Sequence, residues 1–153
     1  MSKIHTANLA YGFSWECHGN MPDISILDLF PEDELEEYLD FDLKTFEIDM
    51  NSYQFMGFDD FLRLINNAFK ILSNKAGYDS SPLAVYPVGE DDFGLYYRVC
   101  IVLESTLTSA SFNKAVSVDS LVVPETKDFL DMVISRYFPK SEPGWLIWPY
   151  STV

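Results

Sequence analysis

Histidine and cysteine, which carry much of the metal and nucleophilic chemistry of proteins, are scarce in this chain. It has two of each, namely His5, His18, Cys17 and Cys100. A structural zinc site needs about four such ligands at compact spacing, whereas here two are adjacent and the others lie far away. Adjacent residues on a strand point to opposite faces, so Cys17 and His18 do not make a nucleophile–base pair. We therefore expect no metal, no cofactor and no disulfide framework.

Other catalytic and ligand-binding patterns are also missing. No glycine-rich loop that cradles phosphates follows a predicted strand. The acidic residues within 40–49 lack the glycine and the final glutamate that a calcium-binding EF-hand loop requires. Carboxylates are numerous, but no pair stands apart as a glycosidase would need. These absences favour a binding protein over an enzyme, and an enzyme with an unrecognised site is kept as an alternative.

Long apolar runs are absent too. Residues 1–16 contain one lysine and no extended apolar stretch, so they do not resemble a secretory signal. No segment approaches the roughly 20 apolar residues that cross a bilayer. Cys100 lies in the short apolar run 99–102, which indicates a buried thiol. The sequence predicts a cytoplasmic protein that does not engage a membrane.

Basic residues are few relative to acidic ones. Ten lysines and arginines stand against 24 aspartates and glutamates, which gives a formal net charge of -14. That charge repels nucleic acids and anionic membranes, so direct nucleic-acid binding is disfavoured and a basic protein partner is favoured. Hydrophobic residues make up 48% of the chain and aromatic residues 16%, enough for a sizeable core. We expect a single domain over 1–153.

The acidic residues are concentrated in one stretch. Residues 22–60 hold thirteen carboxylates and a single base, Lys44, interleaved with large apolar side chains. Within this stretch a short helix is predicted over 31–39, because proline suits the first helical position and Leu35, Tyr38 and Leu39 form one apolar stripe. Carboxylates that lie off this stripe should face solvent, namely Asp33, Glu36, Glu37, Asp40 and Asp42.

These five carboxylates are the first candidates for contact with a partner. Like charges recur four residues apart in this helix, and each such pair costs about 0.2–0.5 kcal/mol in an isolated helix. No lysine or arginine within the helix offsets that cost. An acidic face retained in spite of it suggests recognition. The alternatives are that the face only keeps the protein soluble, or that Arg98 or Arg136 neutralises it.

The aromatic residues near the C-terminus are the second candidates. Trp145, Trp148 and Tyr150 follow one another closely, and aromatic side chains are favoured as anchors of protein interfaces. Their alternative role is to close the hydrophobic core. We predict residues 143–150 as a short, rigid aromatic tail.

Two longer helices are predicted. In residues 59–76 the apolar side chains recur at helical spacing, and Gly77 follows as a C-terminal cap. Residues 124–138 begin with Pro124, carry acidic residues in the first turn and end before Pro139. We expect both helices to pack on a sheet.

Strands are predicted from alternation and from β-branched and aromatic content. They cover residues 8–15, 44–50, 83–88, 93–104 and 112–123. The stretch 93–104 is expected inside the sheet, while Pro87 makes 83–88 short or places it at an edge. Residues 106–111 are predicted as a loop or hairpin tip. The order of elements predicts an α+β domain, with a mainly antiparallel sheet, two long helices packed on it and a short acidic helix.

Taken together, the residues favour an acidic inhibitor that blocks a basic or nucleic-acid-binding target, such as a nuclease. Bacterial toxin-immunity proteins and phage-encoded inhibitors share this general character of small size, acidity and lack of a catalytic motif, although no family signature is present. A small acidic chaperone that holds a segment of a secreted effector is the alternative binding function. The sequence does not indicate the oligomeric state.

Overall fold

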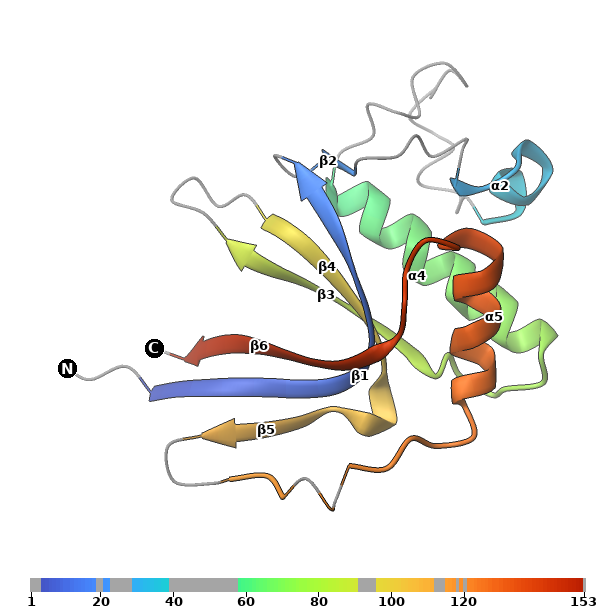
Figure 1. Cartoon of the computed structure of the whole chain (residues 1–153). Coiled ribbons are helices and arrows are strands. Elements are labelled where there is room, and N and C mark those ends of the chain that lie inside the picture. Colours follow the sequence, from blue (N-terminus) through green and yellow to red (C-terminus); the bar gives the residue numbers. More distant parts are fainter. Residues whose placement is uncertain are drawn as a thin grey trace.

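The computed structural model describes residues 4–18, 21–22, 29–38, 58–90, 96–111, 115–117, 119 and 121–152. In chain order they form β1 (Ile4–His18), β2 (Met21–Pro22), α2 (Glu32–Tyr38), α4 (Phe58–Lys75), β3 (Leu83–Glu90), β4 (Tyr96–Leu103), the 3-10 turn η2 (Glu104–Thr106), β5 (Thr108–Ser111), α5 (Lys127–Tyr137) and β6 (Gly144–Thr152). An antiparallel sheet packs against helices on one face, which confirms the expected α+β class (Figure 1).

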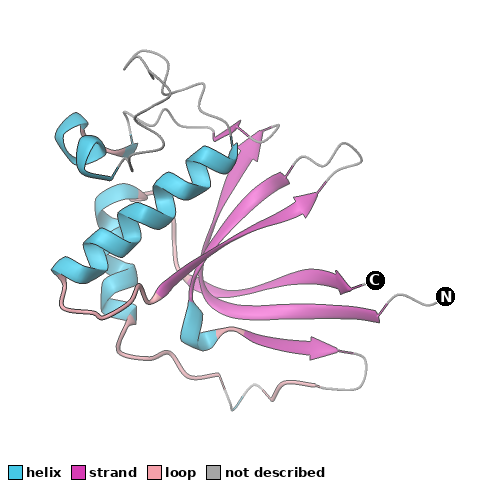
Figure 2. Cartoon of the chain, turned by 180° about the vertical axis from the view of Figure 1, so that it is seen from behind, coloured by secondary structure: helices cyan, strands magenta, loops and turns pink. Residues whose placement is uncertain are grey.

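Strand β1 is the centre of the sheet because it changes partners along its length. Its N-terminal part, residues 4–12, lies between β5 and β6. From Gly12 to Glu16 it pairs with β4, and β3 lies beyond β4. The strand predicted over 8–15 therefore extends further in both directions. We refer to β5, β6 and residues 4–12 of β1 as the β5–β1–β6 arm, which projects away from the helices (Figures 1 and 2).

Gly12 sits where these two parts of the sheet meet. It pairs with Val102 of β4 on one side and with Gly144 of β6 on the other. A Cβ atom at Gly12 would lie 2.1 Å from the carbonyl oxygen of Ile101 and 2.6 Å from the Cα atom of Val102. Since both are backbone atoms of a buried strand, only glycine allows the two strands to approach this closely.

The connection from β4 to β5 keeps both strands on the same edge of β1. Val102 pairs with Gly12 and Thr108 pairs with Leu9, and the intervening η2 leaves the ladder. Thr106 bridges this gap: its Oγ1 accepts a hydrogen bond from the Tyr11 N–H at 2.9 Å and donates to the Leu103 carbonyl at 2.6 Å. The prediction of a loop over 106–111 is therefore wrong for β5. Its small hydroxyl residues form a strand because β1 supplies their backbone partners.

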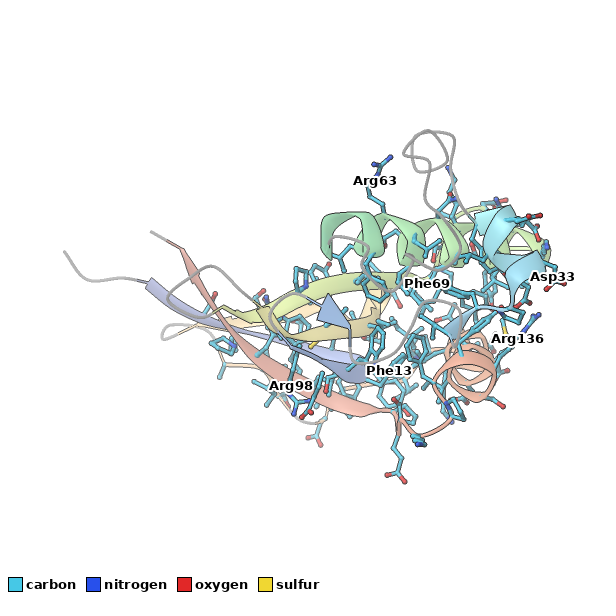
Figure 3. The ribbon with its side chains drawn as sticks, turned by 90° about the horizontal axis from the view of Figure 1, so that it is seen from above. Phe13, Asp33, Arg63, Phe69, Arg98 and Arg136 are labelled. Carbon is cyan, nitrogen blue, oxygen red and sulfur yellow. The ribbon has the colours of Figure 1, made fainter. Side chains whose placement is uncertain are left out.

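One face of the sheet and the helices enclose the main hydrophobic core. Strand β4 alternates, so that Val99, Ile101 and Leu103 point to this core. Helix α4 confirms the prediction over 59–76 within one residue at each end, and Gly77 adopts a positive φ of 93° as the cap requires. Phe13 of β1 and Phe69 of α4, both labelled in Figure 3, are 1% exposed members of the core.

The opposite face of the sheet holds a smaller core. Ala10, Cys100, Val102 and Trp148 are buried there. Trp148 comes from β6 and packs against Tyr86 of β3 in a tilted arrangement, with ring centroids 5.8 Å apart. The Cys100 side chain is buried and free, as expected, and burial raises the pKa of its thiol to about 11. The thiol is therefore protonated and unreactive at neutral pH.

Several further predictions are settled by the structure. Strand β4 lies between β1 and β3, so the inner strand expected within 93–104 is confirmed, and β3 with Pro87 ends the sheet as expected. The described residues within 112–123 are not a strand, because β5 and β6 already occupy both edges of β1 there. The predicted strand 44–50 lies outside the described residues.

Two predictions for the C-terminal part of the chain differ from the structure. The helix predicted over 124–138 begins later, at Lys127, because residues 124–126 form a turn in which the Pro124 carbonyl accepts the Lys127 N–H at 3.1 Å. Residues 143–150 are not a short tail. From Gly144 onward they belong to β6, which pairs with β1 from Gly12 back to Ile4.

Candidate protein-binding surface

Helix α2 separates its apolar and acidic residues as the stripe predicts. Leu35 and Tyr38 are 0% and 1% exposed in the main core, whereas Asp33, Glu36 and Glu37 are exposed. The other two predicted carboxylates, Asp40 and Asp42, lie outside the described residues. A short helix of this kind is unstable alone, so its burial against the core is what holds its carboxylates in place.

Contacts with α5 fix one side of α2. The Tyr38 and Tyr137 hydroxyl oxygens are 3.2 Å apart and hydrogen-bonded, and Tyr137 donates to Glu34 Oε1 at 3.4 Å. Phe30, just before α2, packs edge-on against both tyrosine rings, with centroids 5.3 and 5.1 Å away. Burial, the bond to Tyr137 and the nearby acidic charges raise the pKa of Tyr38, so its hydroxyl stays protonated and donates.

Glu34 has a structural role that sequence reasoning did not assign. Its side chain is 14% exposed and forms an ion pair with Arg136, whose guanidinium also lies 5.3 Å from the centre of the Tyr137 ring. Its other oxygen, Oε2, is buried without a hydrogen-bond partner. Arg136 thus neutralises Glu34 and links α2 to α5. It does not pair with the carboxylates of α2 that were predicted to face solvent.

Contacts with α4 fix the other side of α2. The Asn67 side-chain amide donates to the Tyr38 carbonyl and so satisfies a free acceptor at the C-terminal end of α2. Lys75 Nζ lies 2.6 Å from Glu37 Oε1, and both side chains are about half exposed. An ion pair with this exposure contributes about 0–1 kcal/mol. Glu37 is therefore partly neutralised but still accessible.

Asp33 and Glu36, the other two carboxylates of α2 whose side chains are described, have no such neutralisation. Within the described chain, neither Asp33 nor Glu36 has an ion-pair partner. Arg98, one of the two arginines considered as neutralising, instead pairs with Glu16 at 2.8 Å. Figure 3 shows Asp33 and Arg136 at the same end of the molecule and Arg98 well away from them. Asp33 and Glu36 therefore present uncompensated charge to solvent.

A hollow of about 340 Å³ lies beside this helix. Its wall includes Asp33, Glu34, Arg136 and Tyr137, together with Leu29 and Pro31. The exposed carboxylate of Asp33 and the neutralised carboxylate of Glu34 thus border the same space.

The aromatic candidates lie elsewhere. Trp145 is half-buried and packs edge-on against Tyr11, with ring centroids 5.6 Å apart, whereas Trp148 is only 6% exposed and belongs to the smaller core. Tyr150 pairs through its backbone with Thr6, and its side chain is outside the description. They lie on β6, at the end of the molecule remote from α2 in Figures 1 and 2. The structure therefore does not bring the two sets of candidates together.

The described residues show neither a metal cluster nor a membrane span. No group of three His, Cys, Asp or Glu side chains within them is placed to hold a metal ion. None of their helices is long and apolar enough to cross a membrane. Comparison with protein-family models, curated proteins and solved structures gave no significant match.

Proposed function

We propose that this protein is an acidic cytoplasmic inhibitor of the toxin-immunity or phage-inhibitor kind, which binds a basic protein and is not itself an enzyme. The observation that carries the proposal is the state of α2. Its apolar stripe, Glu34 and Tyr38 are committed to the fold, while Asp33 and Glu36 face solvent without ion-pair partners in the described chain. Such a preorganised acidic surface loses little conformational freedom on binding.

The proposed mechanism is occlusion by charge. A nuclease or other nucleic-acid-binding protein concentrates lysine and arginine where phosphates bind. Carboxylates held on a rigid helix can occupy those positions, and the net charge of -14 accelerates encounter with a cationic target. In this account an arginine or lysine of the target enters the hollow beside Asp33 and Glu34, and Glu36 and Glu37 contact the surrounding basic surface.

The test begins with affinity capture of the target from the native cell or its competitor, followed by binding measurements on the purified pair. The double variant Asp33→Lys with Glu36→Lys changes two exposed carboxylates of α2. Glu125→Lys with Glu142→Lys is the matched control, because both residues are exposed, lie outside α2 and change the net charge equally. At low salt we expect the α2 variant to bind at least about tenfold more weakly and the control to stay within about threefold of wild type.

The same variants decide against the proposal if they behave alike. Equal weakening by both pairs of substitutions would mean that net charge acts without a localised surface. Unchanged binding by the α2 variant, with its circular dichroism spectrum intact, would mean that the acidic helix only solubilises the protein. A captured target that lacks a basic surface would also contradict the mechanism.

A further inference from the structure

The β5–β1–β6 arm carries no charge. Its residues 4–12, 108–111 and 144–152 include no Asp, Glu, Lys or Arg, although charged residues make up 22% of the chain. A strand that faces solvent normally alternates apolar and polar residues, and charged side chains commonly protect exposed sheets from association. The arm lacks this protection along all three of its strands.

One face of the arm is partly exposed and largely apolar. Side chains on the other face, such as Trp148, point into the smaller core. On the exposed face Leu9 lies between Thr108 and Ile147 across the strands, and Ile147 is 73% exposed. The next row consists of Ala7 between Ala110 and Pro149. We call this surface the neutral face; its residues are Ala7, Leu9, Thr108, Ala110, Ile147 and Pro149.

A second exposed hydrophobic residue borders the neutral face. Val122 is 71% exposed and lines a hollow of about 420 Å³ together with Trp145 and Thr108. The residues lining this hollow carry hydroxyl or apolar side chains and no charge. Within the described chain Val122 and Ile147 are the large hydrophobic side chains that stand out as exposed. Val122 is linked to the neutral face through Thr108, which lines the same hollow.

The helices leave this face open. Among the described elements, α4 contacts β3 and α5 contacts β4, so the helices cover the other part of the sheet (Figure 2). Of the outer strands of the described sheet, β3 and β6 each contain a proline, Pro87 and Pro149, and the third, β5, is only four residues long, which limits strand addition at these edges. Proline lacks the N–H that an added strand would need.

We propose that the neutral face binds a second copy of this chain in a two-fold dimer, sheet against sheet. Two chains that each carry -14 repel one another, and the repulsion is smallest where no charge lies at the contact and the acidic helices are far apart. The neutral face meets both conditions, since α2 lies at the other end of the molecule in Figures 1 and 2. A basic partner, by contrast, gains nothing from an uncharged surface.

A two-fold arrangement also suits the shape of the surface. Face-to-face pairing places the Leu9–Ile147 row of one copy against the same surface of the other, so that each copy covers the exposed Ile147 of its partner. Two strands of about eight residues and the four residues of β5, spaced about 4.8 Å apart with a rise of about 3.3 Å per residue, give a face of about 300 Å² per copy. Standard stable interfaces bury about 800 Å² per partner, so we expect a weak dimer.

Sedimentation equilibrium between about 5 and 500 μM tests this proposal. We expect a monomer–dimer equilibrium that strengthens as salt rises from about 50 to 500 mM, because salt screens the repulsion between the two acidic chains. Ile147→Glu should raise the dissociation constant of the dimer at least about tenfold. Val122→Glu, in a segment outside the strands, should weaken the dimer less. Ser135→Glu on the exposed side of α5 adds the same charge away from the neutral face and should not differ from wild type.

Three outcomes would overturn the proposal. The first is a monomer at 500 μM in high salt. The second is an equal response to Ile147→Glu and Ser135→Glu, and the third is a dimer that dissociates as salt rises. Binding of a basic target should weaken with salt and involves α2, whereas the dimer should strengthen with salt and involves the neutral face. Failure of the proposed function and failure of the dimer are therefore distinguishable.

Discussion

Helix α2 and the β5–β1–β6 arm are opposite in charge character although they belong to one small fold. Residues 22–60, which include α2, hold thirteen carboxylates and one base, whereas the arm holds no charged residue. On α2 the apolar stripe is buried and carboxylates face solvent. On the arm the exposed face itself is apolar. The comparison indicates two surfaces with different uses: the first suits a cationic partner and the second suits a contact surface that carries no charge.

The two regions also differ in how they are held. The arm depends on long backbone ladders that meet β4 at Gly12. Helix α2 depends on the burial of Leu35 and Tyr38 and on a few side-chain contacts, namely Tyr38 with Tyr137, Glu34 with Arg136 and Asn67 with the Tyr38 carbonyl. We therefore expect that a change at Gly12 disrupts the whole sheet and that a change at Arg136 affects α2 alone.

The largest effect is expected at the junction of the arm with the rest of the sheet. Gly12→Ala places a Cβ atom against the backbone of Ile101 and Val102, so the strands must separate, with a loss of about 3 kcal/mol or more in the free energy of unfolding. Its pairing partner Gly144 is the control, because a Cβ atom there meets nothing within 4 Å. Urea unfolding of the two variants measures the difference. Equal stability of Gly12→Ala and Gly144→Ala would show that the strands do not approach as described.

A smaller effect is expected from the contacts that hold α2. Arg136→Ala leaves the mostly buried Glu34 without its cation, at a cost of about 1–3 kcal/mol. Hydrogen exchange should accelerate in residues 32–38 more than in β1. Arg98→Ala is the control: it breaks an exposed pair with Glu16 and should cost less than about 1 kcal/mol. If both variants lose the same stability, Glu34 is not an anchor of α2.

The smallest effect concerns alkaline pH and the smaller core beneath the arm. Burial raises the pKa of Cys100 from 9.0 to about 11, so between these values the unfolded chain loses its thiol proton and the folded chain keeps it. Stability contributed by the neutral thiol is complete below pH 9 and is lost as pH rises through 11. The unfolding free energy should decline less over this range in Cys100→Ala than in wild type. Identical pH profiles for the two proteins would contradict the assigned burial.

The sequence predicted those elements whose determinants are local. Helix α4 followed from its apolar spacing and Gly77, and the inner strand followed from the β-branched residues around Val99–Val102. The register of β5 and β6 depends on pairing with β1, about a hundred residues away or more, and no local pattern shows which edges of β1 are free. For that reason a strand was expected in 112–123, and β6 was expected to be a tail.

The candidate surfaces were predictable to different degrees. Helical periodicity placed Leu35 and Tyr38 inside and Asp33, Glu36 and Glu37 outside, which the described helix shows. The role of Glu34 was not predictable, because its partner Arg136 lies 102 residues away in sequence. The neutral face required the cross-strand register that sets Leu9 beside both Ile147 and Thr108. Its lack of charge is visible in the sequence only after the strands are assigned.

The central claim is that the carboxylates of α2, rather than net charge alone, recognise a basic partner. The association rate constant with the captured target, measured from about 25 to 500 mM salt, tests it most directly. We expect the wild-type association rate constant to fall steeply as salt rises. At about 25 mM salt the variant with Asp33→Lys and Glu36→Lys should associate about tenfold more slowly, and its rate constant should depend less on salt. The control with Glu125→Lys and Glu142→Lys should retain most of the wild-type dependence. Superimposable curves for the two variants would contradict the claim.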